Sequence, residues 1–166
     1  MIAFTFTGPG ARRPFLGVHW PPPGEWAQHG RGSRIEHLPV WIAAELWLVE
    51  LDGSVHEVES QLRAERGRLI RRIAEWDEAA ASEFARSCAD RIRELAGRAA
   101  GAGDGRMAAY RADAEAFQNA ADANVAGWVA SRAAAAVEGE AGAARERARQ
   151  SAWLRDRLDL DAALRV

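Results

Sequence analysis

Lysine is absent from this chain, and all 22 of its basic side chains are arginine. Schiff-base catalysis and the phosphate-binding Walker motif both need a lysine, so the sequence excludes these two chemistries. Cysteine occurs once, at Cys88, which excludes an intramolecular disulfide and a cysteine-rich zinc site. A single thiol is typical of a protein in a reducing compartment.

Long apolar runs and a secretion signal are also absent. No apolar stretch approaches the ~18 residues of a membrane helix, and residues 1–9 lack the basic start and the apolar core of a signal peptide. The net charge of −2 creates no field that would attract nucleic acid or an anionic membrane. We therefore expect a cytoplasmic protein that binds neither nucleic acid nor membranes.

The common motifs of enzyme active sites are missing as well. There is no nucleophile elbow, no glycine-rich phosphate loop and no nucleotide fingerprint. The four histidines lack the close spacing of zinc-binding pairs, so we expect no metal and no cofactor. Acid–base chemistry without a cofactor stays open, because a cyclase or an isomerase needs only one acid and a shaped apolar pocket.

The chain changes character near Trp76. All six prolines, all four histidines and most β-branched and aromatic residues precede it, whereas alanine-rich stretches with charges at helical spacing follow. A chain of 166 residues can form one compact domain. The pattern predicts an α+β fold, in which a small, mainly antiparallel sheet from residues 1–76 packs against three or four helices from residues 77–166.

Alternation of apolar and polar side chains locates the strands of the N-terminal part. Residues 2–7 alternate apolar and hydroxyl side chains, which predicts a half-buried strand. Residues 15–20 predict a second short strand, and residues 28–35 have the composition of a loop. Residues 67–73 fit either a strand or a helix, and we favour the strand.

A hairpin is expected in the middle of the N-terminal part. Residues 39–45 predict a short helix, because proline is favoured in the first helical turn. Residues 46–51 are apolar on both faces except at one glutamate, which predicts a strand. Asp52 and Gly53 are typical of a two-residue hairpin turn, so residues 54–60 would form the return strand.

The C-terminal part contains four stripes of apolar or small residues at helical spacing. The first follows Asp77, which is placed to cap a helix, and glycines at 97–105 and 139–142 separate later segments. The stripes are Ala81, Phe84, Cys88, Ile92 and Leu95; Met107, Tyr110, Ala114, Phe117 and Ala121; Val125, Trp128, Val129 and Ala133; and Ala144, Ala148, Ser151, Leu154 and Leu158.

Two carboxylates stand out as candidate functional groups. Glu50 interrupts an otherwise apolar strand, and Glu45 closes the short helix before it. A carboxylate on a buried strand costs free energy unless it is paired with a cation or used in the function. A structural ion pair is the commoner arrangement, and a general base or ligand anchor is the alternative. The arginines available as partners are Arg12, Arg13, Arg71 and Arg72.

Tryptophan is concentrated in the first third of the chain, at Trp20, Trp26, Trp41 and Trp47. Such density builds either an aromatic core or a binding surface, because each indole combines a large apolar ring with one N–H. Trp20 and Trp26 flank a stiff run of three prolines. This segment fits the wall of an aromatic pocket, a docking patch or a lid over the sheet.

Short motifs along the whole chain carry a family resemblance. They are Trp20-Pro21, the Leu-Pro-x-Trp motif at 38–41, residues 45–53, residues 66–73 and residues 149–154. In these motifs the chain resembles a group of uncharacterised proteins common in actinobacteria and their phages, which implies no particular chemistry. Relatives in that group carry a Gly-x-His-x-Cys segment before Leu-Pro-x-Trp, whereas this chain has only His37 there. Residues 39–53 also resemble part of the ADP-ribosyltransferase fold, which implies a degenerate domain of that kind as a weak alternative.

These features favour an accessory protein that binds a small molecule or a protein partner. The residues expected to build its binding pocket are Trp20, Trp26, Trp41, Trp47, Arg12 and Arg13. The rival is a cofactor-free enzyme, in which Glu45 or Glu50, assisted by His37 or His19, acts as acid or base. A third alternative is a homodimer formed through the alanine-rich C-terminal helices. The sequence leaves open which of these applies.

Overall fold

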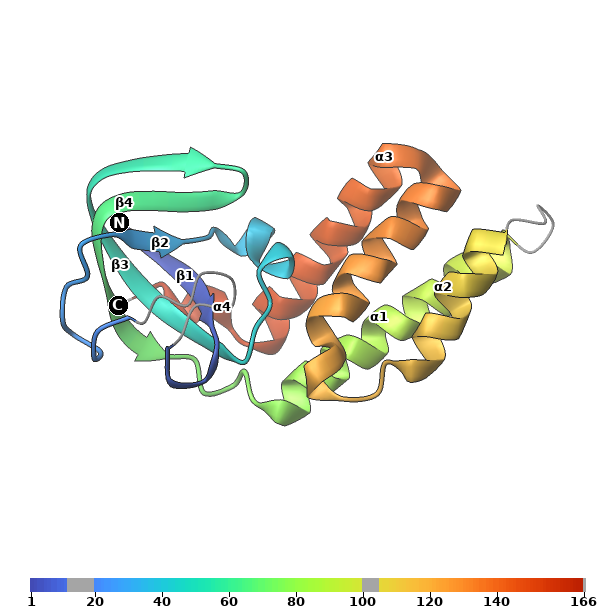
Figure 1. Cartoon of the computed structure of the whole chain (residues 1–166), viewed down its shortest axis with the longest axis horizontal. Helices are drawn as coiled ribbons and strands as arrows, with labels where there is room; N and C mark the ends of the chain where they lie inside the picture. Colours follow the sequence, from blue (N-terminus) through green and yellow to red (C-terminus); the bar gives the residue numbers. More distant parts are fainter. Residues whose placement is uncertain (12–19, 100–104, 166) are drawn as a thin grey trace. The chain divides into compact units, whose positions relative to one another are not determined.

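The chain forms two compact units (Figure 1). A computed structural model describes residues 1–11, 20–99 and 105–165. The strand unit comprises Met1–Asp77 with Leu154–Val166, and the helical unit comprises Glu78–Trp153. All described strands lie in the first unit and long helices follow them, which confirms the α+β class. The expected packing into one compact domain stays a prediction.

The strands form one antiparallel sheet that curls back on itself. Its two outer strands meet, because the Phe4 N–H donates to the Ser33 carbonyl at 3.1 Å and the Ser33 N–H donates to the Phe4 carbonyl at 2.6 Å. The sheet therefore forms a small, nearly closed barrel. In sheet order the strands are β1 (Ile2–Thr7), β3 (Glu45–Val58), β4 (Gln61–Arg72) and β2 (Gly30–Gly32).

Two glycines permit the close approach of β2 and β4. A Cβ atom added to Gly67 would lie only 2.7 Å from the Cα of Gly30, so neither position has room for a side chain. Apolar side chains of the strands, together with Trp20, fill the space that the barrel encloses. The buried members of this core are Ala3, Trp20, Val49, Leu51, Leu62, Ala64 and Leu69.

Strand β1 is buried on both faces rather than on one. Its apolar face carries Phe6, whose ring packs edge-on against Trp76 with 5.4 Å between the centroids. The hydroxyl face is also buried, with Thr5 and Thr7 no more than 9% exposed. The expected strand over residues 2–7 is thus confirmed, but its half-buried character is not.

The hairpin turn lies seven residues beyond the expected place. Strand β3 continues through Gly53, whose φ of +81° is accommodated in an irregularity of the register between β3 and β4. The chain reverses instead at Glu59 and Ser60, both with positive φ, at 48° and 67°. A left-handed residue suits a bulge as well as a turn, so the Asp-Gly pair alone did not locate the reversal.

Other local expectations had mixed outcomes. The strand favoured over residues 67–73 is confirmed as part of β4. The expected loop at 28–35 contains β2. The helix expected at 39–45 is absent, because the 3₁₀ turn η2 (Ile35–Val40) ends at Val40 and β3 begins at Glu45. Pro39 lies near the end of that turn and not in the first turn of a helix. A 3₁₀ segment of this length makes few hydrogen bonds, so the missing N–H of proline costs it little. The strand expected at 15–20 lies almost wholly outside the described residues.

Helices make up the second unit. Helix α3 consists of two arms that reverse at Gly139, where φ is +71° (Figure 1). The last part of α3 and helix α4 belong to the strand unit. The helices are α1 (Glu78–Arg98), α2 (Gly105–Ala116), α3 (Ala123–Arg157) and α4 (Leu160–Ala163), with 3₁₀ turns η1 (Pro9–Ala11) and η3 (Ala120–Asp122). None of the described helices is long and apolar enough to cross a membrane.

The apolar stripes were predicted correctly for α1 and wrongly in part for α3. Every member of the first stripe is buried. Val125 and Trp128 are 49% and 61% exposed, although the third stripe placed them in the core. In the second arm Ala144 and Ala148 are exposed. Both arms are rich in alanine around their circumference, so the spacing of small residues does not identify the buried face.

We predict that Gly67→Ala destabilises the strand unit by about 1–3 kcal/mol, because the new methyl group must displace the β2 backbone. Urea unfolding followed by circular dichroism measures the effect. Gly97→Ala is the control, since the structure leaves open space around that helical glycine and alanine is the better helix former. A Gly67→Ala variant as stable as the wild type would show that the close approach of β2 and β4 is not required.

Candidate functional site

The structure separates the four N-terminal tryptophans. Trp20 is buried in the core of the barrel, with 6% of its surface exposed, and Trp47 is partly buried and packs against the same core. The Trp41 indole N–H donates to the carbonyl of Ser60, at the hairpin turn, at 3.2 Å. Trp26 is on the surface, 38% exposed. Of the expected pocket, the structure thus brings only Trp20 and Trp47 to one part of the molecule, the first inside the barrel core and the second partly buried against it.

The segment that follows the proline run is hydrogen bonded to the edge of β4. The Gly24 N–H donates to the Leu69 carbonyl at 2.8 Å. Ala27 and Gly67 exchange two hydrogen bonds, of 2.8 Å from the Ala27 N–H and 3.2 Å from the Gly67 N–H. These contacts lie on both sides of Trp26 in the sequence, so the backbone that carries its side chain is fixed.

The Trp26 indole lies over two arginine side chains of β4. The guanidinium carbons of Arg66 and Arg68 are 4.6 Å and 4.8 Å from its ring centroid, within the range of a cation–π interaction. Because side chains two residues apart in a strand share one face, both guanidinium groups can approach the same ring. The indole is thereby held on the outside of the barrel.

Each arginine is itself held by a carboxylate on β3. Arg68 donates to Glu50 Oε2 from Nε and from Nη2, both at 2.7 Å. Arg66 donates from Nε to Asp52 Oδ2 at 2.7 Å and also contacts it through Nη2. The pairs lie directly opposite each other in the register. The Trp26 surface, as we call it, consists of Trp26, Glu50, Asp52, Arg66 and Arg68.

The positive and negative charges of the Trp26 surface are equal in number. It carries two cations and two carboxylates, with their side chains between 31% and 56% exposed. The hydrogen bond from Arg66, together with one from the Gly53 backbone, lowers the pKa of Asp52 below its ordinary value. Asp52 therefore remains ionised near neutral pH and keeps Arg66 in place. The arrangement presents a fixed aromatic ring surrounded by polar groups.

The residues expected to act in catalysis have separate partners. Glu50 forms the ion pair just described, which is the structural alternative, although its partner is Arg68 rather than an expected arginine. Glu45 accepts a hydrogen bond from the Trp47 indole N–H at 3.1 Å, and Nη1 of Arg72, one of the expected arginines, lies 4.0 Å from its Oε1. His37 Nε2 lies 3.2 Å from Glu57 Oε1. His19, Arg12 and Arg13 lie outside the described residues.

A metal centre and an enclosed pocket are two further kinds of candidate site. In the described part of the chain, no group of three or more histidine, cysteine and acidic side chains could hold a metal ion. A cavity of about 170 Å³ lies in the strand unit, between β1, the start of η2 and the C-terminal residues Arg155 and Leu164. None of the four N-terminal tryptophans lines it.

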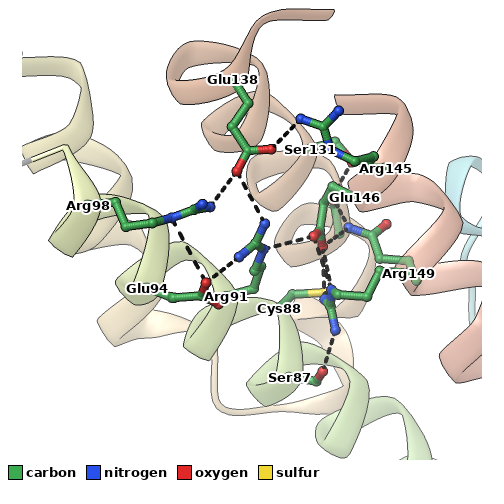
Figure 2. Close-up of polar contacts among 12 residues, drawn as sticks. Ser87, Cys88, Arg91, Glu94, Arg98, Ser131, Glu138, Arg145, Glu146 and Arg149 are labelled. Atoms are coloured by element: carbon green, nitrogen blue, oxygen red, sulfur yellow. Dashed lines mark hydrogen bonds and ion pairs between the residues drawn. The ribbon is translucent and has the colours of Figure 1, made fainter. Parts of the chain in front are cut away.

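A buried carboxylate in the helical unit was missed in the sequence (Figure 2). Only 1% of the Glu146 side chain is exposed. Its Oε1 accepts hydrogen bonds from Arg149 Nη2 at 2.8 Å and from Gln150 Nε2 at 2.9 Å, and its Oε2 accepts one from Arg91 Nε at 3.3 Å. Both oxygens are therefore occupied, which makes Glu146 a structural group of the bundle.

The polar network continues outward from Glu146 through Arg91. Arg91 also contacts Glu94, at 2.6 Å, and Glu138, at 3.7 Å (Figure 2). Hydrogen bonds from Arg145 and Arg98 lower the pKa of Glu138. The network thus links α1 to both arms of α3. The spacing of Glu146 and Gln150, four residues apart on one face of the helix, was the available sequence signal.

Cys88 lies at the edge of this network and is buried. Burial raises the pKa of its thiol to about 12, although Arg149, with Nη2 at 4.0 Å from Sγ, acts in the opposite direction. A thiol with so high a pKa is a poor nucleophile near neutral pH. Cys88 is therefore a core residue, as its place in the first apolar stripe suggests.

No protein-family model, curated protein or solved structure significantly matches the chain. The candidate site is consequently defined by its own geometry alone.

We predict that Glu146→Gln destabilises the helical unit by about 3 kcal/mol, because Arg91 and Arg149 lose the charge that compensates them. Chemical denaturation measures the loss. Glu140→Gln, at an exposed position of the same helix, is the matched control and should change stability by less than about 0.5 kcal/mol. Equal stabilities of the two variants would contradict a structural role for Glu146.

The stability of the protein should fall at alkaline pH through Cys88. Above pH 9 the thiol ionises in the unfolded chain but stays protonated in the folded one, so the free energy of the unfolded state falls relative to that of the folded state. Between pH 8 and pH 10 the wild type should lose about 1.4 kcal/mol more than Cys88→Ala. Urea titrations of both proteins at the two pH values measure this difference, and a parallel decline would show that the thiol is not protected.

Proposed function

We propose that this chain is a binding module whose strand unit docks a protein partner on the Trp26 surface. The observation that carries the proposal is the combination of exposure and immobility at Trp26. A large apolar ring is 38% exposed, yet it is held over two guanidinium groups that are paired with carboxylates. A ring that serves only the core would be turned inward, as Trp20 is.

The energetics of protein interfaces support this use of Trp26. Tryptophan and arginine are enriched among the residues that contribute most to binding, and such residues are surrounded by polar groups that exclude water. A side chain that is already immobilised loses little entropy when a partner binds. The two ion pairs supply polar contacts at the rim without a net charge, so we expect specificity rather than long-range attraction.

The enzyme alternative receives less support from the described residues. Glu50, Glu45 and His37 each engage a different partner, Arg68, the Trp47 indole and Glu57. A general base must reach its substrate, and these contacts already occupy the three groups. We also propose that the module acts in the cytoplasm, since its one thiol is free and buried.

A homodimer is the second candidate, and one observation favours it. Trp128 and Val125 are exposed on one side of the first arm of α3, and Arg132 lies over the Trp128 ring at 5.4 Å. An exposed pair of large apolar side chains is typical of a contact site. Analytical ultracentrifugation of the wild type and of Trp128→Ala tests this candidate, because a dimer through this face would dissociate in the variant.

We predict that Trp26→Ala weakens partner binding by about 10- to 30-fold, because the ring supplies the main apolar contact. Peptides selected against the wild-type protein from a random display library serve as probes. Their affinities are measured by fluorescence polarisation for the wild type and the variant.

Trp128→Ala is the matched control, since it removes an exposed tryptophan from the helical unit. It should leave peptide affinity unchanged. Circular dichroism would establish that both variants are folded. Selected peptides that bind Trp26→Ala as tightly as the wild type, or that are lost equally in both variants, would refute docking on the Trp26 surface.

A further inference from the structure

Three nitrogen-bearing side chains form a row across the sheet, which we call the Arg63 row: Arg31 of β2, Arg63 of β4 and His56 of β3. Strand β4 lies between β2 and β3 (Figure 1). In the register, Arg63 is directly opposite Arg31 on one side and directly opposite His56 on the other. Directly opposite residues project from the same face of a sheet. Because the flanking Leu62 and Ala64 are buried in the barrel core, the Arg63 row projects from the outer face.

Two arginines further along β4 are compensated by carboxylates of β3. Arg66 is directly opposite Asp52, Arg68 is directly opposite Glu50, and each forms an ion pair with its partner. Arg63 lies on the same strand and pairs with the same neighbouring strand, but a histidine occupies the equivalent position opposite it. The sheet therefore supplies a cross-strand carboxylate to the first two arginines and none to Arg63.

The positive charge of Arg31 and Arg63 is left uncompensated. Arg31 donates to the side-chain oxygen of Gln61 at 3.4 Å, and in the part of the chain that the structure describes neither arginine has an ion pair. Glu65, two residues beyond Arg63, has its carboxylate against Gly53 instead. Like charges directly opposite each other destabilise a sheet, so an anion between the two arginines would remove an unfavourable interaction. Arg63 is exposed and Arg31 is partly exposed, so a dissolved anion can reach both.

We propose that the Arg63 row binds a phosphate group, either as the free ion or on a small phosphorylated molecule. A guanidinium group presents its N–H donors in a planar fork that matches two phosphate oxygens. A phosphate monoester carries a charge of about −1.5 to −2 at pH 7, which compensates two arginines better than a single carboxylate does. His56 adds at least one ring N–H in either of its protonation states. Donors on three adjacent strands thus surround one anion that has several oxygens.

Titration of the whole chain with inorganic phosphate, followed by NMR, tests the site. The Nε–H resonances of Arg31 and Arg63 should shift saturably, with sodium chloride used to hold the ionic strength constant. Arg63→Gln should weaken phosphate binding by about fivefold or more, because it removes the central cation. Arg71→Gln is the matched control, since Arg71 is exposed on the same strand but lies opposite Leu48 rather than another cation. It should change the affinity by less than about twofold.

A carboxylate placed opposite Arg63 gives a second test. His56→Glu would face Arg63 as Glu50 faces Arg68, so it should form an ion pair and compete with phosphate. Phosphate binding should weaken by about tenfold or more, while the melting temperature in phosphate-free buffer should not fall. His56→Gln, which adds no charge, should weaken binding by only about two- to threefold.

Phenyl phosphate distinguishes the two sources of the phosphate group. A site for a phosphorylated molecule leaves one phosphate oxygen free, so phenyl phosphate should bind at least as tightly as inorganic phosphate. A site for the free ion contacts every oxygen, so the phenyl ring should weaken binding.

Two results would overturn the proposal. One is the absence of a saturable shift at Arg31 and Arg63 in the wild type. The other is equal weakening by Arg63→Gln and Arg71→Gln, because phosphate would then be attracted to any exposed arginine. If Arg63→Gln does not fold, Arg31→Gln replaces it. Trp26→Ala should bind phosphate as the wild type does, so the Arg63 row and docking on the Trp26 surface are tested separately.

Discussion

The contact between two glycine backbones, Gly30 and Gly67, is the constraint on which the strand unit depends. With only four strands, a sheet closes into a barrel only if some strands approach more closely than side chains normally allow. Glycine at facing positions removes both side chains from that point. The interior that remains is narrow, and it is filled by one large ring, that of Trp20, and by aliphatic side chains. The core and the closure of the sheet are therefore determined by the same two residues.

The same closure explains where the exposed groups lie. The segment before β2 must run along β4 to reach Gly30, and this route fixes Gly24 and Ala27 against the β4 edge. Trp20, before this segment, and Trp26, within it, consequently lie on opposite sides of the sheet. Trp20 lies inside the barrel, and Trp26 lies outside over Arg66 and Arg68. The Trp26 surface is thus a consequence of how the barrel closes.

Sequence periodicity predicted elements in which apolar side chains recur at one regular period. Residues 2–7 form the expected strand and the first stripe of α1 is buried as expected, although β1 is buried on both faces. The strand favoured at 67–73, where the pattern also fitted a helix, is part of β4. The hairpin turn and the buried face of α3 were not found. Asp52-Gly53 suits a bulge as well as a turn, and an alanine-rich helix offers several equivalent faces.

The candidate site was predictable only in part. Sequence composition identified Trp26 and Glu50 as residues of interest. It could not show that Trp26 and Glu50 lie on one surface. The residues that connect them are Arg66 and Arg68, which follow Trp26 by about forty positions in the sequence. Glu146 was overlooked for a related reason. Its charge suggests an exposed position. Arg149, one turn along the same helix, and Arg91, which the fold brings against it from α1, together make burial tolerable.

The division of the chain into units has a consequence for its synthesis. The helical unit is one continuous stretch, Glu78–Trp153, whereas the strand unit is interrupted by it and ends with Leu154–Val166. During translation the barrel strands leave the ribosome first, but the last segment of their unit emerges only after the whole helical unit. The helical unit can therefore complete its fold while the earlier strand unit still waits for its final residues. The strands are synthesised first, but their unit is the last to have all of its residues available for folding.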